Sequence, residues 1–129
     1  MLSATNPKKI FLMAGTNDLR TISFKEYTAR YMQLIKTIKE SMPNASIYIQ
    51  SVLPTNHSMA NYAPNKKIQK ANIILKDIAK DLDCTYIDLY SLYVNSENEL
   101  NIELTRDGVH LFPQSYNIWA KAIEKYIYE

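Results

Sequence analysis

Short apolar runs alternate along the chain with longer segments in which apolar residues recur every three or four positions. The short runs cover residues 9–14, 47–52 and 84–87, and each is typical of a strand buried on both faces. Each run is followed by a segment with helical spacing. The repeated order of strand and helix predicts an α/β domain whose parallel strands are joined by helical crossovers.

The first two helices have recognisable starts. Ser23 and Glu26 have the spacing of a capping box before a run that ends at Pro43, with these apolar positions: Phe24, Tyr27, Tyr31, Leu34, Ile35 and Ile38. Asn65 is predicted to cap the second helix, whose apolar face holds Ile68, Ala71, Leu75, Ile78 and Leu82.

The last helix follows Pro113, a residue that suits the first turn of a helix. Its predicted apolar face holds Tyr116, Trp119, Ala120, Ile123 and Ile127. Functional residues are expected in the loops, because ligands of parallel sheets bind beyond the carboxyl ends of the strands. The segments after residues 14, 52 and 87 are therefore the first places to search for functional groups.

Composition excludes several classes of protein. The 129 residues allow one domain, and a net charge of +2 is too small to indicate nucleic acid or an anionic membrane as a partner. The single cysteine, Cys84, cannot form an internal disulfide or hold a metal alone. No apolar run approaches the roughly 18 residues of a membrane span, and no signal-peptide pattern opens the chain. We expect no metal and no organic cofactor, and the compartment stays open.

The segment after the first predicted strand reads Gly15-Thr16-Asn17-Asp18. Glycine permits a tight exit from the strand, and the Asn17 amide would offer two N–H donors beyond the sheet edge. Such a donor can stabilise a developing oxyanion. An ordinary turn, in which Asn17 and Asp18 bond their own backbone, explains the same residues when the segment is taken alone.

The segment before the last helix reads Asp107-Gly108-Val109-His110. A separation of three residues in a turn lets the Asp107 carboxylate reach Nδ1 of His110, which would fix the ring tautomer and leave Nε2 free as a base. An Asp-Gly turn followed by an incidental histidine is the alternative for this segment alone. A metal site is disfavoured, because no other His, Asp and Glu cluster has ligand spacing.

Taken together, the two segments resemble the SGNH/GDSL-type serine hydrolases, a superfamily of esterases and lipases. The resemblance runs from about Lys8 to Ile127 and implies a flavodoxin-like three-layer fold. It also implies that Asn17 is an oxyanion-hole donor supported by Gly15, and that Asp107 and His110 belong to a Ser-His-Asp triad. The family's nucleophile lies in a Gly-Asp-Ser motif near its N-terminus, and this sequence has no such motif.

The resemblance therefore describes residues 1–129 as a single, N-terminally truncated hydrolase domain with about three strands and three helices. Neither Ser51 nor Ser58 has the family's nucleophile geometry, so we expect this chain alone to be inactive. The strand at 9–14 would become an unprotected sheet edge, and we expect a second copy or a complementary N-terminal segment to pair with it.

The implied function is hydrolysis of a carboxylic ester, with a small acyl group on a sugar as the preferred substrate and lysophospholipids or thioesters as alternatives. A catalytically inactive relative that serves as a binding or assembly module is the competing interpretation. Three other side chains have structural interpretations: Asn72 bonding the backbone, Cys84 as a core thiol, and Trp119 as part of the core. His57 is predicted to be a solvated loop residue.

Overall fold

The computed structural model describes residues 8–13, 19, 22–57 and 64–128. In chain order its elements are β1 (Lys9–Met13), α3 (Phe24–Ser41), β2 (Ser46–Gln50), α4 (Asn65–Asp81), β3 (Thr85–Ile87), α5 (Tyr90–Tyr93), the short 3₁₀ turns η1 (Ile102–Leu104) and η2 (Pro113–Ser115), and α6 (Tyr116–Ile127).

The strands form one parallel sheet in the order β1-β2-β3. Ile10 lies opposite Ile47, and Gln50 lies opposite both Met13 and Ile87, so the three strands run toward the same end of the sheet. Within the described part of the chain, β1 is an edge strand. The α/β prediction is confirmed, with the second and third strands each shorter than expected.

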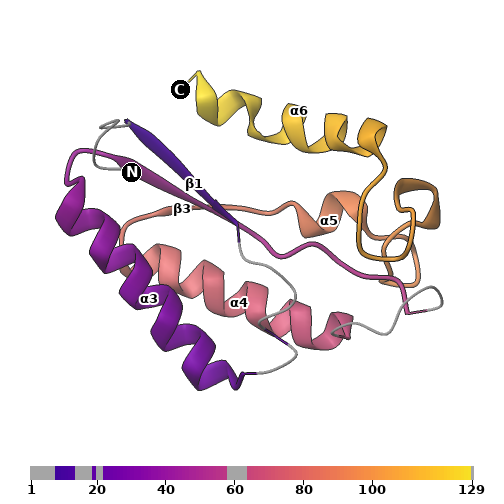
Figure 1. The fold of residues 1–129 in the computed structure, drawn as a ribbon, viewed down its shortest axis with the longest axis horizontal. Helices are drawn as coiled ribbons and strands as arrows, with labels where there is room; N and C mark the ends of the chain where they lie inside the picture. The colour runs from indigo at the N-terminus through magenta and orange to yellow at the C-terminus, as the bar shows by residue number, and fades with distance from the viewer. Residues whose placement is uncertain (1–7, 14–18, 20–21, 58–63, 129) are drawn as a thin grey trace.

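The sheet lies between two helical layers (Figure 1), with α3 and α4 on one face and α6 on the other. Alternate residues of a strand point to opposite faces. Accordingly, Ile47 and Ile49 pack in the core under α3 and α4, whereas Tyr48 packs with Trp119 and Ile123 of α6. Among the described residues, no helix is both long enough and apolar enough to cross a bilayer.

The start of α3 confirms the Ser23 half of the predicted capping box, and the start of α4 differs from its sequence signal. Ser23 caps α3 by accepting the backbone N–H of Glu26 at 3.1 Å, while the Glu26 carboxylate pairs with Arg30. The prediction that Asn65 caps α4 is wrong, since Pro64 holds the N-cap position. The Asn65 side chain instead binds segments distant in sequence, because its buried position faces two loops.

The predicted apolar face of α6 is only partly right. Trp119 and Ile123 pack on the sheet as predicted, together with Ala122 and Tyr126, which the prediction missed. The other three predicted residues, Tyr116, Ala120 and Ile127, are exposed. The 3₁₀ turn η2 includes Pro113, so the α-helix itself begins only at Tyr116. Because α6 covers a single sheet face from outside, its apolar stripe is narrow, and several apolar residues remain in contact with solvent.

Candidate active site

Asp107 and His110 lie in a tight turn between η1 and η2. The orange segment that follows α5 and contains this turn lies beyond the carboxyl ends of the strands (Figure 1). The turn is closed by an antiparallel bridge between Thr105 and Leu111. His110 Nδ1 lies 2.7 Å from Asp107 Oδ2. Because an ionised carboxylate only accepts hydrogen bonds, Nδ1 carries the proton of this contact and Nε2 is left as the basic nitrogen.

The two oxygens of Asp107 have separate partners. Oδ1 accepts the backbone N–H of Val109 at 3.0 Å and of His110 at 2.8 Å, while Oδ2 faces the ring. Hydrogen bonds to the ionised form stabilise it. The backbone N–H and ring of His110, followed by the N–H of Val109, hold the pKa of Asp107 well below its ordinary value. The carboxylate therefore stays charged wherever the ring can act as a base.

The pair is open to solvent, with 71% of the His110 side chain and 43% of the Asp107 side chain exposed. Gly108, between them, is buried and has a φ of 92°, a backbone conformation that glycine adopts without steric cost. Its carbonyl accepts the backbone N–H of Asn56 at 2.9 Å. The turn thus presents two reactive side chains outward while its own backbone is attached to the segment that follows β2.

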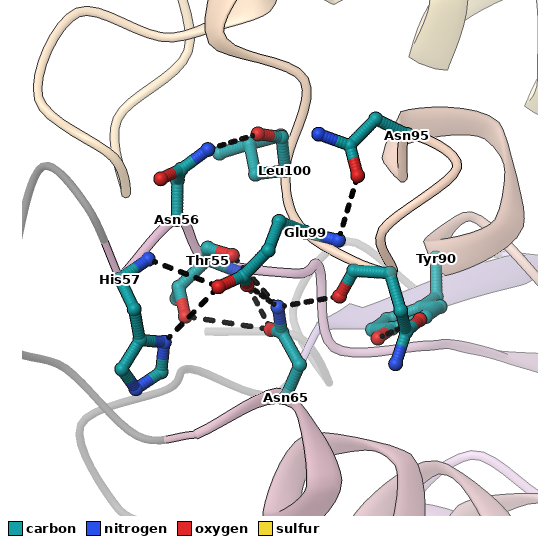
Figure 2. A network of polar contacts seen from close by, with 9 residues as sticks. Thr55, Asn56, His57, Asn65, Tyr90, Asn95, Glu99 and Leu100 are labelled. Atoms are coloured by element: carbon teal, nitrogen blue, oxygen red, sulfur yellow. Dashed lines mark hydrogen bonds and ion pairs between the residues drawn. The ribbon is translucent and has the colours of Figure 1, made fainter.

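A buried polar network holds that segment in place (Figure 2). The Asn65 amide accepts the N–H of Thr55 at 2.8 Å and donates to the Thr55 carbonyl at 2.8 Å. It also donates to the Asn98 carbonyl and to Glu99 Oε2. Sequence reasoning missed this network, because Asn65 precedes its partners Asn98 and Glu99 by 33 and 34 residues along the chain. The polar run around Asn95–Glu99 gave no signal of its own.

His57 forms a second contact with a carboxylate in the same network. Its Nδ1 lies 3.7 Å from Glu99 Oε1, and 40% of the His57 side chain is exposed. The prediction of a solvated loop residue is confirmed. This distance is too long for a hydrogen bond, so the His57 ring is not fixed by the carboxylate as the His110 ring is.

Two of the four predicted site residues, Gly15 and Asn17, lie outside the described residues, as does Ser58. Ser51 is fully buried, and its Oγ accepts the backbone N–H groups of Leu89 and Tyr90 at 2.9 Å each. A hydroxyl with those partners has a structural role. In the described ranges, no serine hydroxyl is hydrogen-bonded to the ring of His110.

The other residues singled out in the sequence, Asn72, Cys84 and Trp119, contribute to the packing and hydrogen bonding of the fold. Asn72 bonds the N–H and the carbonyl of Val52 at 2.7 and 3.0 Å, as the backbone-bonding interpretation predicted. Cys84 is half-buried beside the core, and burial raises the pKa of its thiol. Trp119 packs on the sheet and donates to Gln50 Oε1 at 2.5 Å. Over the described part of the chain, no three His, Cys, Asp or Glu side chains gather as a metal site would require.

A surface hollow of about 500 Å³ lies beside β3 and α4, away from the Asp107–His110 turn. Tyr86, Asp88 and Tyr90 are among its lining residues. Burial, followed by the Asp88 charge, raises the pKa of Tyr86 to about 12, so this phenol stays neutral at physiological pH. Neither Asp107 nor His110 lines the hollow, and we assign it no part in the candidate site.

Several solved structures are similar to this chain in sequence and fold. One is a Streptococcus pneumonia protein described as a platelet activating factor. It is 26% identical to this chain, with a TM-score of 0.87, and the match covers 94% of this chain and 60% of the other. A GDSL-like lipase from Bacteroides thetaiotaomicron shares 26% identity and a TM-score of 0.80, over 95% of this chain and 62% of its own.

An acetyl xylan esterase is similar in fold, with 22% identity and a TM-score of 0.78, over 96% of this chain and 69% of its own. The chain therefore spans less than two thirds of the length of the first two relatives. No curated protein sequence matches it. The model of the GDSL-like lipase/acylhydrolase family matches residues 1–118, a range that includes the Asp107–His110 turn. On that match, the chain belongs to the GDSL-like lipase/acylhydrolase family.

Proposed function

We propose that this chain supplies the acid–base half of an esterase site. His110 acts as general base and then general acid, and Asp107 orients its ring and stabilises the imidazolium. The observation that carries the proposal is the 2.7 Å contact of His110 Nδ1 with Asp107 Oδ2, which leaves Nε2 free on an exposed ring. The family's hydrolytic chemistry supports the same assignment.

Residues 1–129 form a single, N-terminally truncated hydrolase domain in this proposal. The serine nucleophile comes from a segment outside this sequence, either upstream in a longer protein or on a separate chain that pairs with the β1 edge. The proton that His110 takes from the serine goes to the leaving alcohol as the acyl-enzyme forms. A second copy of the chain is the other candidate for the β1 edge.

Asn17 is the proposed oxyanion donor, and Gly15 gives the backbone room to approach the substrate. A donor that acts on charge developing in the transition state affects kcat more than binding. In a complete enzyme, Asn17→Ala should therefore lower kcat by about 10²- to 10³-fold and change KM little. A higher KM with an unchanged kcat would assign Asn17 to substrate binding instead.

The substrate we favour is a small acyl ester of a sugar. The acetyl xylan esterase, similar to this chain in fold, supports this class over long-chain lipids. Turnover of an acetylated xylo-oligosaccharide, a lysophospholipid and an acyl thioester by a complete enzyme would rank the three classes. Faster turnover of the lysophospholipid or the thioester would replace the sugar ester as the assigned substrate.

The decisive experiment is a complementation assay on an aryl acetate. The chain is first tested alone. It is then co-expressed with the part of the Streptococcus pneumonia protein that lies outside the region aligned with this chain. We expect hydrolysis only in the complemented form. Hydrolysis by the chain alone, lost in His110→Ala, would place a nucleophile within these 129 residues. A stable complex without hydrolysis would favour the non-catalytic binding module.

Sequencing the DNA upstream of the Met1 codon tests the origin of the serine. An open frame that encodes an apolar strand and a Gly-Asp-Ser motif would make the nucleophile part of the same polypeptide. An in-frame stop close to Met1 would direct the search to a separate chain. Either result fixes which protein must be used in the assays of His110 and Asn17.

A further inference from the structure

Thr105 lies at the centre of the turn that presents His110. Only 1% of the residue is exposed, in contrast to the open side chains of Asp107 and His110. The Thr105 hydroxyl accepts the backbone N–H of Gly108 at 3.0 Å and donates to the carbonyl of His110 at 2.7 Å. One buried hydroxyl thus joins the middle of the turn to the backbone of the proposed base.

Exposure of the Asp107–His110 pair explains why such an anchor matters. An exposed ion pair gains little net energy, because both side chains lose freedom and solvent screens their charges. The contact between the two side chains therefore cannot by itself hold the ring. The backbone on which they stand must be fixed by groups that water does not reach.

Buried bonds supply that fixation on both sides of Gly108. Its N–H binds the Thr105 hydroxyl, and its carbonyl accepts the N–H of Asn56. The Asn56 side chain is buried as well and donates to the Leu100 carbonyl at 2.8 Å (Figure 2). The turn is consequently held between η1 and the segment after β2. Its backbone is bound by the exposed Asp107 carboxylate and by the Thr105 hydroxyl, which is the buried one of the two.

We propose that Thr105 is a positioning residue for His110, whose hydroxyl fixes the turn in the conformation that brings the ring onto Asp107. The catalytic meaning of this assignment rests on the proposed function. The geometric part does not, since it concerns the ring and the carboxylate of this chain alone. Thr105 touches no reacting atom and acts through the backbone of Gly108 and His110.

The test uses ¹⁵N NMR of the imidazole rings in the chain as it exists. The chain has two histidines, so His57 provides a reference in the same spectrum. Wild type and Thr105→Ser, which keeps the hydroxyl, should hold the neutral His110 ring with its proton on Nδ1. Thr105→Val keeps the side-chain shape without the hydroxyl, and should shift the ring to a mixture of tautomers while His57 is unchanged.

A second signal comes from the Asp107 carboxyl carbon in the same samples. Loss of the hydroxyl should loosen the N–H groups that Asp107 accepts and raise the pKa of its carboxyl toward the ordinary value of 3.8. An unchanged His110 tautomer and an unchanged Asp107 pKa in folded Thr105→Val would overturn the proposal. So would a serine variant that behaves like valine.

Should valine prevent folding, Thr105→Ala carries the same test, because it removes the hydroxyl without placing a methyl group against the Gly108 N–H. A wild-type ring in folded Thr105→Ala then refutes the positioning role. Absence of esterase activity in the complementation assay would overturn the proposed function and leave these spectra unaffected. The two proposals therefore fail separately.

Discussion

Two contacts join a histidine to a carboxylate in the part of the chain that the structure describes, and they differ in what else the carboxylate binds. In the first, Asp107 uses one oxygen for backbone N–H groups of its own turn and the other for the ring of His110. In the second, Glu99 binds the Asn65 amide and the backbone N–H of His57, with the His57 ring 3.7 Å away.

This difference distinguishes the proposed catalytic pair, Asp107 and His110, from the structural contact of Glu99 with His57. Both imidazole rings are exposed to solvent, so exposure alone does not distinguish a general base from a histidine without a catalytic role. A carboxylate that is held by its own turn can fix the tautomer of a neighbouring ring. Among the described residues, the ring of His110 is the one group that bonds the Asp107 oxygen facing it. Glu99 instead joins the start of α4 to the turn before η1, and the ring of His57 lies at the margin of that structural network.

The strongest way to break this comparison is to remove each ring in turn. In a complemented enzyme, His110→Ala should lower kcat on an aryl acetate by roughly 10²- to 10⁴-fold, the contribution of a positioned general base. His57→Ala, the matched control, should leave kcat essentially unchanged. A comparable loss in both variants would remove the distinction between the two histidines.

The next largest effect is expected at Asn65, where Glu99 has its main structural partner. Asn65→Ala removes the amide oxygen that accepts the Thr55 N–H and the amide donor to the carbonyls of Thr55 and Asn98, although the Leu100 N–H still binds the Thr55 carbonyl. The loss of these buried bonds should lower the free energy of unfolding by about 2–4 kcal/mol. Urea denaturation measures the change. Asn117→Ala, on the exposed side of α6, is the control and should stay within about 0.5 kcal/mol of wild type.

Removing only the charge of Glu99 sharpens the comparison further. Glu99→Gln keeps an oxygen for the Asn65 amide but weakens a charge-assisted bond to a neutral one, a loss of about 1 kcal/mol in unfolding free energy. Esterase turnover of the complemented enzyme should not change. A drop in kcat like that of His110→Ala would mean that Glu99, not Asp107, serves the catalytic ring.

The smallest effect on stability is expected at Asp107, because its pair is exposed. Its pKa is lowered in the folded chain, so the contact favours folding above the ordinary pKa of 3.8 and loses that effect as pH falls below it. Urea midpoints of wild type and Asp107→Asn should therefore differ slightly at pH 7 and converge in acid. A gap that widens as pH falls would contradict this sign.

Local sequence signals predicted the elements because their causes are local. The alternation of short apolar runs and helical spacing gave the parallel sheet, and Ser23 caps α3 three residues before its partner N–H. The same holds for Asp107 and His110, whose separation of three residues already allowed the contact found in the turn. The functional roles of Gly15 and Asn17 stay predictions, since both lie outside the described residues.

Tertiary structure decided which polar groups serve the fold. Asn65 had the sequence of a helix cap, yet its amide binds Thr55 and the turn at Asn98. Ser51 had the residue type of a nucleophile, yet two backbone N–H groups occupy its oxygen.

The full packing face of α6 and the bond of the Thr105 hydroxyl to the His110 carbonyl could not be predicted from the sequence either. A capping bond or a three-residue turn closes within one short segment, so its residues can be read together. A buried polar group takes whichever partner the packing of distant segments brings within about 3 Å, and only the folded chain fixes that choice.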